Sequence, residues 1–136
     1  MYLALIPDEQ TTKALRAFAL ALPSDAHCTI IHSKAPLPAG DLPLPDRLNK
    51  GFKNVETYAD GVAIFGSKVK VAVLKLRITF ELVGLREQVE RICQAHNISW
   101  SREWAFSPHV TLGGADARLI AEPPAVLRFD RMEWRP

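Results

Sequence analysis

With 136 residues, of which 48% are apolar and 24% charged, the chain has the composition of one compact globular domain. No apolar run approaches the roughly 20 residues that span a bilayer, and no secretory signal opens the sequence. The net charge of +2 allows an anionic ligand but argues against stable binding of duplex nucleic acid. We therefore expect a cytoplasmic protein without a membrane segment.

The first part of the chain predicts a strand, a helix and a second strand. The apolar run Tyr2–Ile6 predicts the first strand, and Asp8 follows it as a helix-start signal. Apolar residues then recur at the spacing of one helix face, at Leu15, Phe18, Ala19 and Leu22. His27–Ile31 predicts the next strand, and the proline-rich stretch Ala35–Pro45 predicts a surface loop.

The second part of the chain repeats this order. Asp60–Gly61 predicts a turn before the strand Val62–Phe65, and a short glycine turn joins that strand to Val69–Leu74 as a hairpin. Pro108–Leu112 predicts another short strand, and Val126–Trp134 a final one. Between Val69–Leu74 and Pro108–Leu112 a helix is expected, with one face formed by Leu82, Leu85, Val89, Ile92 and His96.

Each of the two strand–helix–strand units ends in the same short motif. His27–Ile30 and His109–Leu112 both read histidine, apolar residue, threonine, apolar residue. Because side chains alternate across a strand, the histidine and threonine of each motif share one face. Their apolar partners are expected to point into the core: Cys28, Ile30, Val110 and Leu112. Two of the chain's 4 histidines fit this pattern, which is a strong signal.

This arrangement suits displacement at a phosphodiester. Two imidazoles that flank one phosphate can act as general base and general acid near neutral pH. We predict this role for His27 and His109, although the sequence leaves open which one is the base. Thr29 and Thr111 are predicted to donate hydrogen bonds to the phosphate oxygens. No metal or cofactor is predicted, because the carboxylates do not cluster near either motif, and His32 is expected at an exposed strand end.

The two motifs, with Ser107-Pro108 before the second and Tyr2–Leu5 at the first strand, resemble the signatures of the 2H phosphoesterase superfamily. The resemblance spans essentially the whole chain. It implies an α+β fold with two lobes related by a pseudo-two-fold axis, in which antiparallel sheets flanked by helices surround a central groove. One domain would then span 1–136, with intertwined lobes at about 1–50 and about 60–136.

The short chain and the string Ala26–Lys34 look most like phage-encoded members of that superfamily. Those include anti-CBASS nucleases, which destroy the cyclic oligonucleotide messengers of bacterial immunity. This resemblance implies that a 2′-hydroxyl attacks the adjacent 3′–5′ linkage and that the 2′,3′-cyclic phosphate is then hydrolysed, in the host cytoplasm. The RNA 2′,3′-cyclic phosphodiesterases, once called 2′–5′ RNA ligases, resemble the chain more distantly. They make RNA processing the first alternative, and a nucleotide-sequestering module without catalysis is the second.

Recognition of the base is expected from aromatic stacking and a few polar groups. Tyr2 and Glu133 occupy places comparable to those of a tyrosine and a glutamate in the phage group. Trp104 and Phe106, which lead into the second motif, and Trp134 near the C-terminus are the other candidates. The expected partner is therefore a cyclic nucleotide or an oligonucleotide, and no obligatory protein partner is evident.

Overall fold

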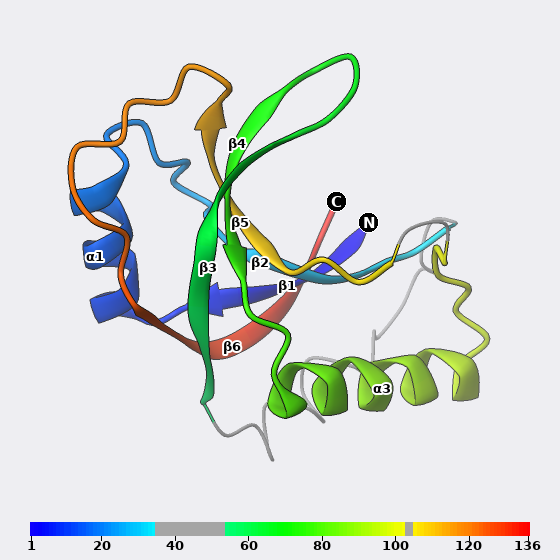
Figure 1. Cartoon of the computed structure of the whole chain (residues 1–136). Helices are drawn as coiled ribbons and strands as arrows, with labels where there is room; N and C mark the ends of the chain where they lie inside the picture. The colour runs from blue at the N-terminus through cyan, green and yellow to red at the C-terminus, as the bar shows by residue number, and fades with distance from the viewer. Residues whose placement is uncertain (35–53, 103–104) are drawn as a thin grey trace.

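The computed structural model describes residues 1–34, 54–102 and 105–136 and has an α+β architecture, as predicted (Figure 1). The predicted loop at Ala35–Pro45 and the candidate Trp104 lie outside the described residues. Along the described chain the elements follow in the order β1 (Tyr2–Pro7), α1 (Glu9–Phe18), β2 (Cys28–His32), β3 (Val55–Phe65), β4 (Val71–Leu76), α3 (Phe80–Ala95), β5 (His109–Gly114) and β6 (Val126–Arg135). All the predicted strands and both predicted helices are therefore present.

The strands form one sheet that closes on itself in the order β1-β2-β5-β4-β3-β6. Every neighbouring pair is antiparallel. The hairpin β3–β4 joins strands that follow each other in sequence, whereas β2 and β5 come from distant parts of the chain. The helices α1 and α3 lie well apart at the flanks of this sheet (Figure 1). The strands of residues 1–34 and those of residues 54–136 thus share a single closed sheet.

Helix α1 begins where the sequence predicts and ends earlier. The carboxylate of Asp8 accepts a hydrogen bond from the Thr11 backbone N–H at 2.7 Å, which caps the helix. The prediction that Leu22 continues the helix face was wrong, because Ala19 already adopts an extended backbone and forms a β-bridge with Leu119. The buried face of the helix is therefore short, and Leu15 anchors it in the core.

Two glycines shape the hairpin in different ways. The predicted turn at Asp60–Gly61 is wrong, because these residues lie inside β3, where the pairing with β4 shifts register and Gly61 has a φ of 95°. This irregularity is a bulge, which bends a strand without ending it. The real turn contains Gly66, at a φ of 105°, and a Cβ there would lie 2.0 Å from the Val69 carbonyl oxygen. Only glycine fits that position.

The core lies on one face of the motif strands. The four apolar residues of the two motifs are buried, as predicted. Cys28 lies between Leu5 and Val110 in the register of the sheet, and Leu74 follows on the far side of Val110. His96 was expected on the apolar face of its helix, but it is exposed at the C-cap, where the helix ends. Neither described helix is long and apolar enough to cross a membrane.

Candidate active site

The pairing of β2 with β5 places the two His-x-Thr motifs side by side. Cys28 lies opposite Val110 in this antiparallel pair. Continued by one residue in each direction, this register aligns His27 with Thr111, and Thr29 with His109. Residues opposite one another project from the same face of a sheet. The two imidazoles and two hydroxyls therefore share one surface, the cradle, above a buried apolar floor.

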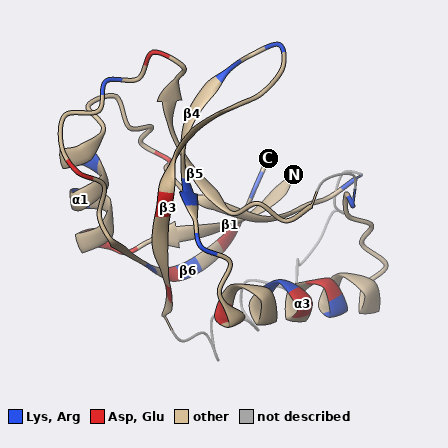
Figure 2. Ribbon diagram, viewed as in Figure 1, with Lys and Arg blue, Asp and Glu red and all other residues tan. Residues whose placement is uncertain are grey.

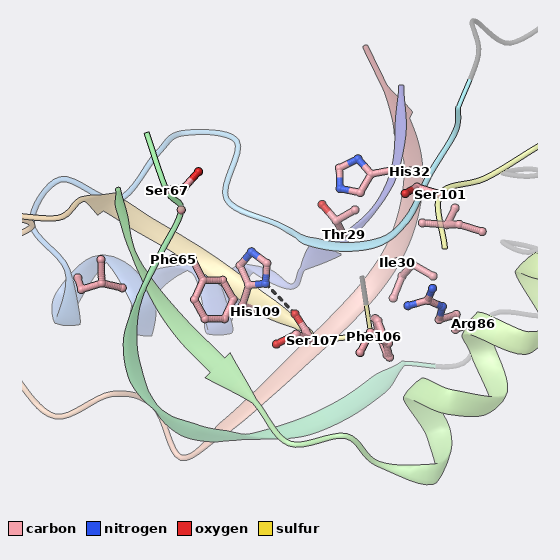
Figure 3. Close-up of a pocket in the computed structure, with 14 residues that line it drawn as sticks. Thr29, Ile30, His32, Phe65, Ser67, Arg86, Ser101, Phe106, Ser107 and His109 are labelled. Atoms are coloured by element: carbon pink, nitrogen blue, oxygen red, sulfur yellow. Dashed lines mark hydrogen bonds between the residues drawn. The ribbon is translucent and has the colours of Figure 1, made fainter. Parts of the chain in front are cut away.

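Both imidazole rings are held in the same way. Nδ1 of His27 lies 2.8 Å from the carbonyl oxygen of Asp25, and Nδ1 of His109 lies 2.8 Å from that of Ser107. A carbonyl oxygen only accepts hydrogen bonds, so Nδ1 carries a proton and donates it in each case. The other nitrogen, Nε2, then remains for chemistry on both histidines. The bond from His109 to Ser107 is visible in Figure 3.

The surroundings of His27 are aromatic on one side and charged on another. Tyr2 stacks on its ring, with centroids 4.9 Å apart and planes inclined by 23°. Nη1 of Arg135 lies 3.2 Å from Nδ1 of His27 and 2.5 Å from the Asp25 carbonyl oxygen. Because that Nδ1 already carries a proton, the guanidinium donates to the carbonyl. Nε of Arg135 donates to Glu133 Oε1 at 2.7 Å, which fixes the guanidinium in place.

The surroundings of His109 are aromatic and open onto a cavity. Phe65 meets its ring edge-on, with centroids 4.8 Å apart and planes inclined by 70°. Beside it lies a cavity of about 810 Å³, the side cavity, which both His109 and Thr29 line (Figure 3). The other lining residues come from β2, the β3–β4 turn, α3 and the segments around β5, and they are Ile30, Ile31, His32, Ile64, Phe65, Gly66, Ser67, Arg86, Ser101, Ala105, Phe106 and Ser107.

His32 is a third histidine at this site. Its side chain is exposed at the end of β2, as predicted, and it lines the side cavity. Its ring lies 5.8 Å from the ring of Tyr2, which also stacks on His27. Partial desolvation lowers the pKa of His32 below its ordinary value of 6.5, and the positive charges of the N-terminal amine, His27 and His109 lower it further. His32 is therefore neutral at pH 7.

The predicted base-binding residues divide into groups. Tyr2 contacts His27, and Glu133 reaches the same histidine through Arg135. Phe106 lines the side cavity next to His109. Trp134 packs against the core, and its indole N–H is buried with no hydrogen-bond partner among the described residues. The structure thus brings the first three candidates to the site, whereas Trp134 packs against the core.

The sequence did not point to several residues that the fold brings to the cradle. Arg135 lies two residues from Glu133 on β6, and alternation along a strand is the signal that would have linked them. Lys75 is paired with His109 across β4 and β5, so it projects from the same face. Phe65 reaches the site from the end of β3 and Arg86 from α3, and no local pattern links them to it.

The first motif also contains a buried cysteine, Cys28. Burial raises the pKa of the Cys28 thiol to about 12, so the thiol stays protonated at neutral pH. Within the described residues, no three histidine, cysteine, aspartate or glutamate side chains gather as a metal site. Figure 2 shows basic and acidic segments interleaved on α3 and β6. Contacts to an anion are therefore expected from single cations such as Arg135.

No protein-family model matches the chain, and no curated protein sequence matches it. The resemblance to the 2H phosphoesterases accordingly rests on the sequence motifs alone. The closed antiparallel sheet carries both motifs on neighbouring strands. This shared surface is the basis for the functional proposal that follows.

Proposed function

We propose that the protein is a 2H-type phosphodiesterase that cleaves a cyclic nucleotide or oligonucleotide by acid–base catalysis at His27 and His109, without a metal. One observation carries the proposal. The antiparallel pair Cys28–Val110 lies at the centre of the two motifs, and its register, continued by one residue in each direction, aligns each histidine with the threonine of the other motif. A structural histidine needs no such partner, whereas a phosphate held between two imidazoles needs both halves of this arrangement.

The connectivity of the chain supports the finer fold proposal, a pseudo-two-fold relation between two lobes. The series strand, helix, strand, strand occurs twice in the element order. In the closed sheet, β2 is followed outward by β1 and then β6, and β5 is followed outward by β4 and then β3. Exchanging β1 with β4, β2 with β5 and β3 with β6 therefore leaves the strand order unchanged. An axis through this pair would relate His27 to His109 and Thr29 to Thr111.

The proposed reaction is an in-line displacement at phosphorus. Nε2 of one histidine removes the proton of the attacking 2′-hydroxyl, and the oxygen forms a bond to phosphorus. The bond to the 5′-oxygen breaks, and Nε2 of the other histidine gives that oxygen a proton. The hydroxyls of Thr29 and Thr111 donate to the non-bridging oxygens, where negative charge accumulates. Water then opens the 2′,3′-cyclic phosphate with the two histidine roles exchanged.

The resemblance to phage proteins makes the 3′–5′ linked cyclic nucleotides of CBASS immunity the first substrate class that we propose. RNA processing by a 2′,3′-cyclic or 2′–5′ phosphodiesterase is the alternative, because it uses the same two imidazoles. A sequestering module is the second alternative. It is less favoured by the geometry, because binding alone does not require two imidazoles with both Nε2 atoms left for chemistry.

A substrate panel tests the proposal. The purified protein is incubated with 3′,3′-cyclic dinucleotides, 2′–5′ linked oligoadenylate and 2′,3′-cyclic mononucleotides, in excess EDTA, and the products are resolved by chromatography. We expect cleavage of the cyclic dinucleotides that EDTA does not slow. Loss of activity in EDTA that added metal restores would contradict the mechanism. Recovery of every substrate intact would contradict the enzyme and favour the sequestering module, whereas cleavage of only the last two substrates would favour RNA processing.

A further inference from the structure

We propose that the side cavity binds a nucleobase next to the cleaved phosphate, and that Arg86 selects guanine there. This inference extends the proposed function and assumes one part of it, that the cradle binds the phosphate. Thr29 and His109 belong to both the cradle and the side cavity. A nucleotide whose phosphate lies between the histidines therefore has its next group at the mouth of this cavity.

The size and walls of the side cavity suit a base. Its volume of about 810 Å³ falls within the range of roughly 300–1,000 Å³ that is usual for small-molecule sites. Ile64, Phe65 and Phe106 supply apolar and aromatic surface, on which the flat face of a base can stack. His32, which is neutral at pH 7, and Ser67 add polar groups that can contact a sugar.

Arg86 is the one arginine or lysine among the described lining residues, and its setting is specific. Its side chain is 17% exposed, and Nε donates to Glu90 at 3.0 Å. The guanidinium carbon lies 4.6 Å from the centre of the Phe106 ring, over which it stacks. In the described part of the chain, these contacts occupy Nε of Arg86 and the flat face of its guanidinium group. The two Nη groups remain as donors to a ligand in the cavity, and Figure 3 shows Arg86 beside Phe106.

The choice of guanine follows from hydrogen-bonding geometry. A guanidinium fork donates two parallel hydrogen bonds to O6 and N7 of guanine, whereas adenine presents an amino donor in place of O6. A fork that is already held by Glu90 and Phe106 loses little freedom on binding. The predicted result is a preference of roughly tenfold for guanine over adenine.

Binding of mononucleotides tests this inference separately from cleavage, because GMP and AMP contain no phosphodiester. We expect the wild-type protein to bind GMP about tenfold more tightly than AMP by calorimetry. Arg86→Lys keeps the charge but loses the fork, so the two affinities should come within about twofold of each other. Phe106→Leu removes the stacking surface and should weaken the binding of both nucleotides. The matched control is Arg91→Lys, an exposed position on the same helix, which should change neither affinity.

Two outcomes would overturn the inference. One is that Arg86→Lys lowers the affinities for GMP and AMP by the same factor, which would indicate that Arg86 contacts the phosphate and not the base. The other is an unchanged preference in that variant. Circular dichroism and thermal unfolding of each variant keep a folding defect apart from a binding defect. If the protein prefers GMP but cleaves no substrate of the panel, the proposed enzyme is refuted and the base site is retained. If it cleaves a substrate but binds GMP and AMP equally, the base site is refuted and the enzyme is retained.

Discussion

The two halves of the cradle share one local geometry and differ in what surrounds it. Each histidine donates from Nδ1 to a carbonyl two residues earlier in the chain, at the same distance of 2.8 Å. Around His27 the fold adds a stacked tyrosine and the pair Arg135–Glu133. Around His109 it adds an edge-on phenylalanine and the side cavity.

In the proposed mechanism, the shared geometry of the two histidines serves proton transfer, and their different surroundings serve substrate recognition. Acid–base catalysis needs two imidazoles with the same exposed nitrogen, and the repeated motif provides both. A substrate with two different ends needs unlike surroundings, and those come from different elements on the two sides. The His27 half is polar and fixed by a guanidinium, whereas the His109 half is open and apolar. We therefore expect substitutions at the histidines to act alike, and substitutions around them to act differently.

The largest effect is expected from the histidines themselves. His27→Ala and His109→Ala should each lower kcat by about 10³-fold, because each removes one proton-transfer group. The double variant should lose little more than either single one, since the two groups act in one step. Steady-state kinetics on the best panel substrate measures this. His96→Ala, at the exposed end of α3, is the control. A tenfold smaller effect at one histidine would break the equivalence of the two halves.

A smaller decrease in kcat, acting through His27 and not His109, is expected from substitution of Arg135. Arg135→Gln removes a donor to the Asp25 carbonyl, which also accepts the hydrogen bond from Nδ1 of His27. The carbonyl and the ring bonded to it should be less firmly positioned, and kcat should fall about tenfold. Arg135→Lys should not restore the rate, because a lysine lacks the fork that reaches both Glu133 and the carbonyl.

Nuclear magnetic resonance of the ring nitrogens makes the Arg135 test specific to one half. The spectrum of His27 should change in Arg135→Gln while that of His109 stays the same. Arg131→Gln, an exposed position on the same strand, is the matched control and should leave both spectra and the rate unchanged. Equal changes at the two histidines would show that Arg135 acts through general stability.

The smallest effect concerns pH and His32. Its pKa is lowered in the folded protein, so the unfolded chain binds a proton more readily as the pH falls below 6.5. The wild-type protein should therefore lose stability between pH 7.5 and pH 5.5 more steeply than His32→Gln, as measured by urea midpoints. The same change at His96, which does not line the cavity, is the control. A steeper loss in His32→Gln would contradict the direction of the shift.

Much of the fold could be predicted from local patterns. The strand β1, the cap at Asp8 and the helix face of α3 follow from apolar spacing and capping residues, which act within a few positions. The errors fell where tertiary contacts overrode a local signal. Leu22 lies outside its predicted helix because Ala19 forms a β-bridge with Leu119, and Gly61 forms a bulge because β4 continues alongside it.

The contacts of the candidate site are likewise of two kinds, those between residues close in sequence and those between distant parts of the chain. The sequence by itself determined the two motifs and the orientation of each imidazole, because the carbonyl that each one contacts lies two residues away. Only the tertiary structure decided that Arg135 contacts His27, from 108 positions along the chain. The same holds for the meeting of Phe106 and Arg86 at the side cavity. These contacts depend on strand order and on closure of the sheet, which residue spacing along one strand or helix does not specify.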